Sequence, residues 1–296
     1  MKIIVCLKEV IDPKLNLDFG LTNRVIFREG RPLKLDPNDA ASLAMAINLK
    51  SANKDSQIEI TLISIGPERV EYYLRGGLAL GADRAVRIWD EGFEALSPYS
   101  KARLLTRAAS ILGADLIFLA TQSLDTGNGL VGIFMAAWLN LSCVSDVIGL
   151  ALDNQLNIVN ITKDIGLGQR EKIQCCLPAV ITVKGEGVIH YASLDKLIES
   201  QYSDITFFSP SDLGIAAVDF KNDPTTVTDL IFPRPASKKI PPLDSSLLAF
   251  YRILQLLEGG LVKRKGLMLQ GSADELAERL FELLKEEGVI RSAIKP

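Results

Sequence analysis

Short apolar runs alternate with amphipathic segments over the first two-fifths of the chain, and this alternation restricts the fold more than any other feature. The runs lie at 2–7, 58–67, 84–89 and 116–120, and each is too short for a typical helix. Apolar strands that alternate with helices are typical of a parallel sheet covered on both faces. The sequence therefore predicts an α/β fold whose first strand begins near Met1.

Capping residues mark where the intervening helices begin and end. Asp36 is placed as the N-cap of "DPNDAASLAMAINLK", with a proline directly after it and Asp39 in the first turn. Ser97, again followed by a proline, opens a second helix. Gly81 and Gly113 stand where helices end in the left-handed conformation that glycine tolerates. These local signals predict helices between the strands.

From about Asn154 the pattern changes. Residues 155–166 and 172–187 look like strand pairs with turns, which indicates an antiparallel extension of the sheet. The later stretch "FPRPASKKIPP" contains several prolines, which resist both helix and sheet and indicate an extended arm.

Two amphipathic helical patterns close the sequence, at 244–259 and 272–287. The second has a serine cap, acidic residues in its first turn and Gly288 at its end. We expect one domain over 1–215 and an arm with C-terminal helices over 216–296. The spacing alone does not decide whether the last helix packs on its own domain or on a partner chain.

Composition excludes several classes of protein. Hydrophobic residues make up 48% of the chain and charged residues 23%, a balance typical of globular proteins. The net charge of −3 supplies no basic field for nucleic acid or anionic lipid. No apolar run approaches the roughly 18–20 residues of a membrane span, and the start lacks a signal-peptide cleavage site. We therefore expect a cytoplasmic protein.

Cysteine and histidine usage offers little catalytic chemistry. Cys6, Cys143, Cys175 and Cys176 form no C-x-x-C pair, so we expect reduced and mostly buried thiols. Cys175 and Cys176 would face opposite sides of a strand. His190 is the single histidine and has no motif around it, which argues against a Ser-His-Asp triad or a histidine-ligated metal.

A glycine motif follows the fourth apolar strand. Gly127, Gly129 and Gly132 spell G-x-G-x-x-G between that strand and a helical segment. In the dinucleotide fingerprint the loop follows the first strand, and an acid about 20 residues on binds the ribose. Here the nearest downstream acid, Asp146, does not plainly end a second strand. Backbone N–H groups that approach a phosphate at a helix start are therefore favoured over an NAD site or a purely structural turn.

The residues around the glycines support a strand–loop–helix unit. Leu130, Phe134, Trp138 and Leu141 recur near helical spacing and predict one buried stripe, most simply part of the core. Asp125 in the loop is placed either to hold a ribose hydroxyl or to tighten the turn.

In these residues the chain resembles the β subunit of electron-transfer flavoproteins, a group that includes nitrogen-fixation-associated and electron-bifurcating forms. The resemblance covers residues 1–215 and, more loosely, the C-terminal arm. It is carried, in order, by "IIVCLKEVID", "DPNDAASLAMAINLK", "IGP", "LALGADRAV", "TQSLDTGNGLVG", "LPAVITV" and "HYASLDKLIES".

The resemblance implies a fold and a role. The fold is an α/β parallel-sheet nucleotide-binding domain of the adenine nucleotide alpha hydrolase-like type, with an antiparallel extension and a C-terminal helical arm. The arm would dock on an electron transfer flavoprotein α subunit, which holds most of the redox FAD. The domain itself would bind AMP or a second FAD. The insert "FGLTNRVIFREGRPLKLDP" and the long C-terminus favour FAD. Such a chain is an electron carrier subunit and not an enzyme by itself. Membership of a bifurcating complex is one possibility that the resemblance includes.

The resemblance also implies a nucleotide site, with phosphates held by the backbone N–H groups of Gly127–Gly132. Carried over by position, the site comprises Cys6, Asp36, Pro37, Asn38, Asp39, Ile65, Gly66, Gln122, Ser123, Leu124, Asp125, Thr126, Gly127, Asn128, Gly129, Leu130, Val131, Gly132 and Ile133.

A second implied site is a recognition loop after "LPAVITV". In the family this loop projects a leucine, here Leu194, into a hydrophobic pocket of an acyl-CoA dehydrogenase-like partner, and Tyr191 and Leu197 lie next to it in the sequence. An apolar anchor ringed by polar residues supplies most of the energy of a transient interface. Without the resemblance, Leu194 is equally well an ordinary residue of a helix face.

The chain departs from the family pattern at several positions. Asp36 replaces a usual asparagine, Pro13 stands where many simple carriers have a tyrosine, and Gly129 and Leu130 stand where the family has amide side chains. Two other classes of function stay open. They are a Rossmann-type NAD(P)-dependent oxidoreductase, and a homodimeric adenine-nucleotide-binding regulator similar to universal stress proteins.

Overall fold

The computed structural model describes residues 1–12, 32–54, 56–153, 157–185, 191–215, 223–225, 246–257 and 270–286. The chain divides into two compact units, Met1–Leu230 and Ile231–Pro296. Pro13, His190, Gly288 and the proline-rich stretch 232–242 lie outside the described residues.

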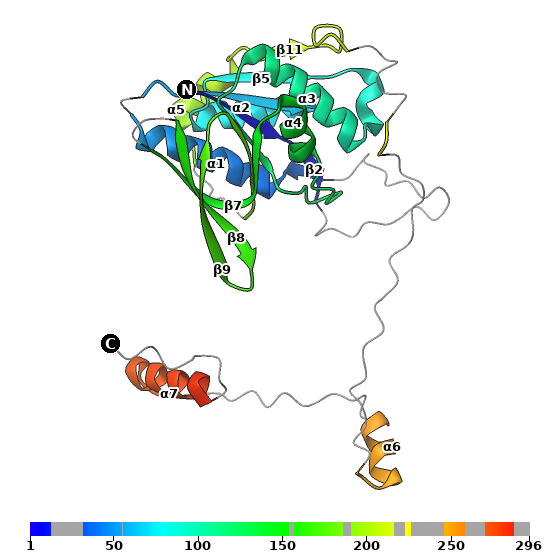
Figure 1. Ribbon diagram of the computed structural model, residues 1–296, viewed down its shortest axis with the longest axis vertical. Coiled ribbons are helices and arrows are strands. Elements are labelled where there is room, and N and C mark those ends of the chain that lie inside the picture. The colour runs from blue at the N-terminus through cyan, green and yellow to red at the C-terminus, as the bar shows by residue number, and fades with distance from the viewer. Residues whose placement is uncertain are drawn as a thin grey trace. The chain divides into compact units, whose positions relative to one another are not determined.

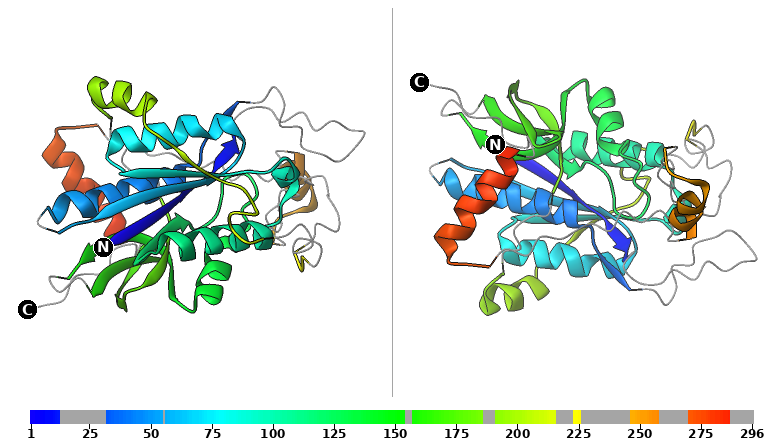
Figure 2. Two further views of the ribbon diagram at one scale, coloured as in Figure 1. Left: turned by 90° about the horizontal axis from the view of Figure 1, so that it is seen from above. Right: turned by 90° about the horizontal axis from the view of Figure 1, so that it is seen from below.

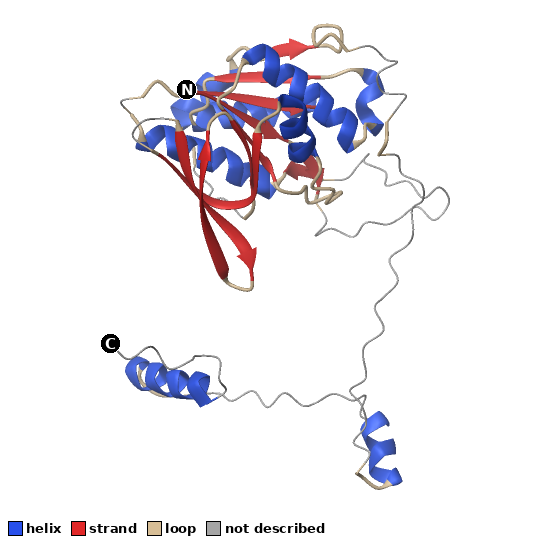
Figure 3. Ribbon diagram, in the orientation of Figure 1, coloured by secondary structure: helices blue, strands red, loops and turns tan. Residues whose placement is uncertain are grey.

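A central sheet organises the unit Met1–Leu230 (Figures 1 and 3). Its strands are β1 (Lys2–Leu7), β4 (Glu59–Ile65), β5 (Arg84–Ile88), β6 (Leu116–Ala120), β7 (Ser142–Leu152), β8 (Ile158–Gly166), β9 (Gln169–Cys176), β10 (Ala179–Val183) and β11 (Thr206–Phe208). They are ordered β11-β5-β4-β1-β6-β10-β7-β8-β9. A second sheet pairs β2 (Glu9–Ile11) with β3 (Leu33–Leu35) in antiparallel fashion. The predicted α/β class is confirmed.

Helices cover both faces of the central sheet (Figure 2). The helices of this unit are α1 (Pro37–Ala52), α2 (Glu71–Leu80), α3 (Pro98–Leu112), α4 (Val131–Leu139) and α5 (Leu194–Gln201), with 3-10 turns η1 (Glu68–Val70) and η2 (Glu91–Ala95). Leu43 of α1 and Leu74 of α2 pack in one buried cluster, whereas Leu104 of α3 and Met135 of α4 pack in the other. Because α1 and α2 lie on one face and α3 and α4 on the opposite face, β1 is buried on both sides.

The local helix signals are confirmed. The Asp36 carboxylate caps α1 by accepting a hydrogen bond from the Asn38 N–H (2.9 Å). Ser97 Oγ caps α3 in the same way, and accepts a hydrogen bond from the Ser100 N–H (3.1 Å). Gly81 ends α2 with φ +121°, and the glycine after α3 also has a positive φ. Side chains near in sequence satisfy the free N–H groups of a helix start, so these boundaries are legible without tertiary information.

The assignment of 172–187 to an antiparallel extension is wrong for its second strand. β10 lies between β6 and β7 and is parallel to both. All of its residues are buried, in agreement with an uninterrupted apolar sequence, "AVITV". The antiparallel part consists of β7, β8 and β9 instead, and β8 and β9 form a long ribbon in Figure 1.

The predicted buried stripe on α4 is also wrong in part. The residues of α4 that are fully buried are Gly132, Met135 and Ala136, because α4 packs on the sheet through small or flexible side chains. Phe134 and Trp138 instead stack on each other, and both contact the Tyr99 ring of α3 edge-on. Trp138 remains 39% exposed, whereas Phe134 and Leu141 are partly buried and pack against the core cluster on this face of the sheet. The stripe therefore belongs to the core in part, and at Trp138 it covers the α3–α4 contact.

The four cysteines are free, but only two are buried. Cys6 and Cys175 are buried, whereas Cys143 and Cys176 are exposed. Cys175 and Cys176 take opposite faces of β9, as the alternation of a strand predicts. The expectation of mostly buried thiols therefore holds for half of them.

The described residues of the unit Ile231–Pro296 form α6 (Ala249–Leu257) and α7 (Ala273–Glu286), within the predicted helical ranges. In the first turn of α7 the Glu275 carboxylate accepts a hydrogen bond from the N–H of Ser272, the residue before the helix (3.0 Å), as in a capping box. In the parts of the chain that the structure describes, every helix is too short or too polar to cross a membrane.

Candidate functional site

The loop after β6 lies where the strand order reverses. The chain passes from β1 to β4 and β5 on one side, then returns to place β6 on the other side of β1. β4 and β6 are both parallel to β1, so the carboxyl ends of the three strands meet at one edge of the sheet. In open α/β sheets, ligands bind at this edge and at this reversal. The candidate site is therefore made of the residues that follow β1, β4 and β6, with the start of α1.

Each position of the motif requires glycine for a structural reason. Gly127 and Gly129 have φ of +60° and +63°, a left-handed conformation that other residues rarely adopt. Gly132 lies in α4 where it crosses β10, and a Cβ there would lie 2.6 Å from Thr182 Cγ2. Residues 126–128 at the tip of the loop are exposed to solvent. The loop is thus tightly turned but open at its tip.

The start of α4 presents polar backbone groups. Leu130 at the N-cap provides no side-chain hydrogen bond to the first turn. The N–H groups of Val131, Gly132 and Ile133 lack intrahelical acceptors by their position in the first turn. Such N–H groups, together with the helix dipole, favour an anion at a helix start.

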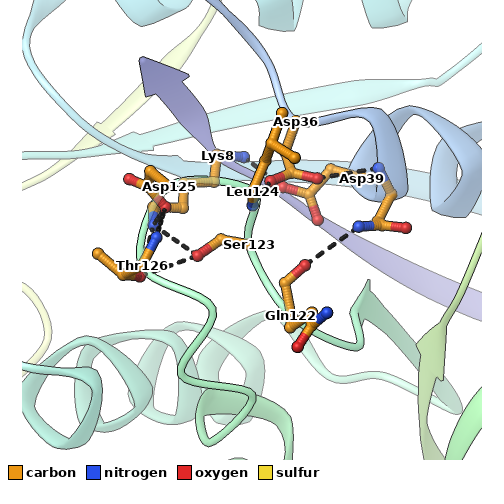
Figure 4. A network of polar contacts seen from close by, with 9 residues as sticks. Lys8, Asp36, Asp39, Gln122, Ser123, Leu124, Asp125 and Thr126 are labelled. Atoms are coloured by element: carbon orange, nitrogen blue, oxygen red, sulfur yellow. Dashed lines mark hydrogen bonds and ion pairs between the residues drawn. The ribbon is translucent and has the colours of Figure 1, made fainter. Parts of the chain in front are cut away.

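Lys8 ties the loop to the end of β1 (Figure 4). Its Nζ donates to Asp125 Oδ1 (2.5 Å), Ser123 Oγ (2.9 Å) and Thr126 Oγ1 (3.5 Å). The Ser123 and Thr126 hydroxyls are 3.0 Å apart, and the Thr126 N–H donates to Asp125 Oδ1. Asp125 therefore tightens the turn, one of the two roles that its position allows.

Two buried carboxylates at the start of α1 hold the ends of β1 and β6 and the loop after β6 (Figure 4). Asp39 Oδ2 accepts from the Lys8 N–H (2.7 Å) and its Oδ1 from the Ala120 N–H (3.0 Å). Asp36 Oδ2 accepts from the Leu124 N–H (2.6 Å), in addition to its capping bond. Because each oxygen accepts from a backbone N–H, these carboxylates are structural parts of the loop's support.

The electrostatics separate the acids of the site. Burial, followed by the nearby charge of Asp36, raises the pKa of Asp39 well above its ordinary value, although the Lys8 and Ala120 N–H groups act in the opposite direction. Burial alone would also raise the pKa of Asp125, but the hydrogen bond and charge of Lys8 outweigh it and lower that pKa. Asp125 is thus the acid whose ionised form the site favours most clearly.

Asn38 links the start of α1 to two loops. Its Nδ2 donates to the Gln122 carbonyl (3.1 Å), and its Oδ1 accepts from the Gly185 N–H (3.1 Å) after β10. The predicted segments from α1 and from the loop after β6 are therefore in direct contact.

The other predicted site residues lie at the same edge or beneath it. Ile65 ends β4 and Gly66 follows it, and the preceding Ser64 is opposite Leu7 of β1. Cys6 lies inside β1 and is 7% exposed, and burial, followed by the charge of Asp39, raises the pKa of its thiol. Cys6 therefore supports the floor of the site as a neutral thiol.

Sequence reasoning missed Lys8. A lysine directly after a buried parallel strand is a signal in itself, because it lies at the edge where ligands bind. Its role became visible only with the neighbouring loop in place. Asp146, the acid considered for a ribose, lies in β7, which β10 separates from β6. The acid of the dinucleotide fingerprint ends the neighbouring strand, so this arrangement does not reproduce the fingerprint.

The predicted partner-binding residues are exposed. Leu194 begins α5 and is 70% exposed, Leu197 one turn later is 41% exposed, and Tyr191 before the helix is 91% exposed. α5 packs beside α2 (Figure 2), so this helix lies away from the sheet edge described above.

Comparison with known proteins identifies relatives that match most of the chain. Residues 24–191 match the sequence family described as "Electron transfer flavoprotein domain". The chain is 30% identical over 220 residues to the electron transfer flavoprotein subunit beta of Methylophilus methylotrophus, which covers 74% of this chain and 83% of that protein.

Two further relatives come from other systems. Protein FixA of Sinorhizobium fredii is 26% identical, with 83% of this chain and 88% of the relative covered. The caffeyl-CoA reductase-Etf complex subunit CarD of Acetobacterium woodii is 28% identical, with 73% and 81% covered.

Proposed function

The chain belongs to the electron transfer flavoprotein family, and from this premise we propose that it is the β-type subunit of a heterodimeric electron transfer flavoprotein. In this role it binds a nucleotide, pairs with an α-type subunit and passes electrons between flavins and partner proteins. The flavin supplies the redox chemistry, and the chain supplies binding, orientation and docking.

The nucleotide site that we propose is the loop after β6 with the start of α4. The observation that carries the proposal is the position of this loop, with free first-turn N–H groups, at the reversal of the strand order. Backbone N–H groups of Gly127–Gly132 hold the phosphates. Lys8 and Asp39 keep the loop in register with β1.

We propose FAD as the occupant of this site, with AMP as the alternative. The support is sequence similarity to FixA and to a subunit of a reductase–Etf complex, together with the insert before α1. The residues of the loop after β6 and the start of α4 fit an adenylate phosphate, which both nucleotides contain. An electron-bifurcating complex remains a further proposal on the same grounds.

The docking site that we propose is the exposed apolar side of α5. Leu194 is its anchor, and Tyr191 and Leu197 flank it. The partner is an acyl-CoA dehydrogenase-like enzyme, whose surface would bury the leucine on association. A member of the family in this role needs no general acid or base of its own.

Co-expression and purification of the chain with an α-type subunit tests the proposal. We expect two subunits that co-elute with a yellow flavin, and two nucleotides per heterodimer after extraction. Two FAD would assign FAD to the β-type site, and one FAD with one AMP would assign AMP. A stable homodimer with ATP, or tight NAD(P)H binding with hydride transfer, would instead select one of the two rival classes.

A further inference from the structure

α5 is a short helix that burial cannot hold in place. Of its residues only Ser200 is buried, while Leu194, Leu197 and Ile198 are 70%, 41% and 54% exposed. A helix of this length is only marginally stable in water without tertiary support. Some other interaction must therefore keep α5 helical with its apolar side chains pointing outward.

Arg75 of α2 supplies that interaction. Its Nη1 donates to three carbonyl oxygens at the end of α5, those of Ser200 (2.9 Å), Gln201 (2.8 Å) and Ser203 (2.9 Å). The last carbonyls of a helix have no intrahelical donor, and a cation near them is also favoured by the helix dipole. One guanidinium thus closes the C-terminal end of α5.

Arg75 is itself held by a neighbouring network. Glu71, one turn earlier in α2, accepts from Arg75 Nη2 (3.5 Å) and from Arg87 Nε of β5 (2.8 Å). The Arg87 guanidinium lies 4.8 Å from the ring centre of Phe207 in β11, the strand that follows α5. The stretch from the C-terminal end of α5 to β11 is therefore fastened to α2 and β5.

We infer that Arg75 is a positioning residue for partner docking: it fixes α5 so that Leu194 and Ile198 face the partner in a pre-formed arrangement. The inference rests on the proposed docking function of α5. Pre-ordering an exposed anchor lowers the conformational entropy lost on association, so it strengthens docking without adding a contact.

The test uses the heterodimer with Arg75→Gln, Arg75→Lys and the matched control Arg84→Gln. Arg84 lies in β5, and its side chain is 53% exposed. Among the described residues its guanidinium pairs only with Glu59 and does not contact α5. Hydrogen exchange of 194–203 is compared with that of 122–133. In the Arg75→Gln variant the backbone amides of 194–203, and not those of 122–133, should exchange roughly ten- to hundredfold faster than in the wild type. This is the factor that the loss of a charge-assisted hydrogen bond implies. Arg75→Lys should restore part of the protection, and Arg84→Gln should match the wild type.

Electron transfer gives the second measurement. The donor is an acyl-CoA dehydrogenase reduced by its own acyl-CoA substrate, and the heterodimer is the acceptor. For Arg75→Gln we expect KM for the heterodimer to rise roughly three- to tenfold with kcat unchanged, because only the ordering of α5 is lost. Unchanged exchange in 194–203, or faster exchange with unchanged KM, would overturn the inference.

The two levels of the argument can fail separately. If the wild-type heterodimer accepts no electrons from the dehydrogenase, the proposed docking function is wrong, whereas the exchange data still decide whether Arg75 orders α5. If Arg75→Gln does not yield a folded heterodimer with its nucleotide content, the same comparison is made with Arg75→Lys, for which partial loss of protection is the expected result and full protection the contradicting one.

Discussion

The ammonium of Lys8 lies 2.5 Å from Asp125 Oδ1 and joins the end of β1 to the loop after β6. The lysine and aspartate side chains are 30% and 11% exposed, so the pair is partly shielded from water. It holds the loop at the place where the strand order reverses. The conformation of the proposed phosphate site therefore depends on a residue that is distant in sequence.

Replacement of Lys8 by methionine should loosen this loop. The Asp125 carboxylate would lose its cationic partner, and we expect a loss of about 1–2 kcal/mol in the free energy of unfolding. The nucleotide content of the purified heterodimer should fall as well. Urea unfolding and nucleotide extraction measure the two effects. Lys50→Met is the control, because the Lys50 side chain is 31% exposed and pairs with Asp83, and it should leave nucleotide content unchanged. Equal nucleotide content in both variants would contradict the role of Lys8.

Two glycine-to-alanine changes in helices should have opposite effects. At Gly132 a Cβ would lie 2.6 Å from Thr182 Cγ2, so Gly132→Ala must displace α4 from β10 and should cost about 1–3 kcal/mol. At Gly76 in α2 nothing lies within 4 Å of the added atom, so Gly76→Ala should stabilise by about 0.5–1 kcal/mol. Urea midpoints give both values. A neutral Gly132→Ala would mean that α4 does not need this close approach.

Truncation of the exposed leucine should separate docking from nucleotide binding. Leu194→Ala should slow reduction of the heterodimer by an acyl-CoA dehydrogenase, because an interface loses its apolar anchor. Flavin content should stay at the wild-type level, since α5 lies away from the loop after β6. Stopped-flow reduction of the flavin measures the rate. Unchanged kinetics would remove Leu194 from the interface.

The Asp223 carboxylate should make the free energy of unfolding depend on pH in the acid range. It accepts hydrogen bonds from the Ser97 and Ser100 hydroxyls and from the Thr225 N–H and Oγ1. Burial alone would raise the pKa of Asp223, but these hydrogen bonds outweigh it and lower the pKa to about 2.

Because that folded-state pKa lies below the unfolded value of about 3.9, the stabilisation is present above pH 4 and is lost as the pH falls toward 2. Asp223→Asn should therefore lose less stability than the wild type between those pH values. The urea midpoint measured across this range checks the sign, and parallel curves for the two proteins would contradict it.

Local signals explain why much of the fold is legible from the sequence. Asp36 and Ser97 cap helices through neighbours two and three residues away, and β6 is bounded as its apolar run indicates. The resemblance assigns the start of α1 and the loop after β6 to one site, and the structure brings Asn38 and Gln122 into contact.

The remaining features depend on distant partners. β10 reads as the continuation of a hairpin, yet its place between β6 and β7 is fixed by packing on both faces. The hydrogen bonds of Lys8 and of Arg75 join residues more than 100 positions apart, so no spacing rule exposes them. In α4, the choice between Met135 and Trp138 as the buried side follows from the close approach at Gly132.

A crystal structure of the heterodimer with its bound nucleotides tests the central claim most directly. We predict phosphate oxygens within about 2.7–3.2 Å of backbone N–H groups in Gly127–Gly132, with Lys8 at the side of the loop. A nucleotide bound elsewhere in this chain, or a β6–α4 loop that closes on its own side chains in the fully loaded complex, would contradict the account.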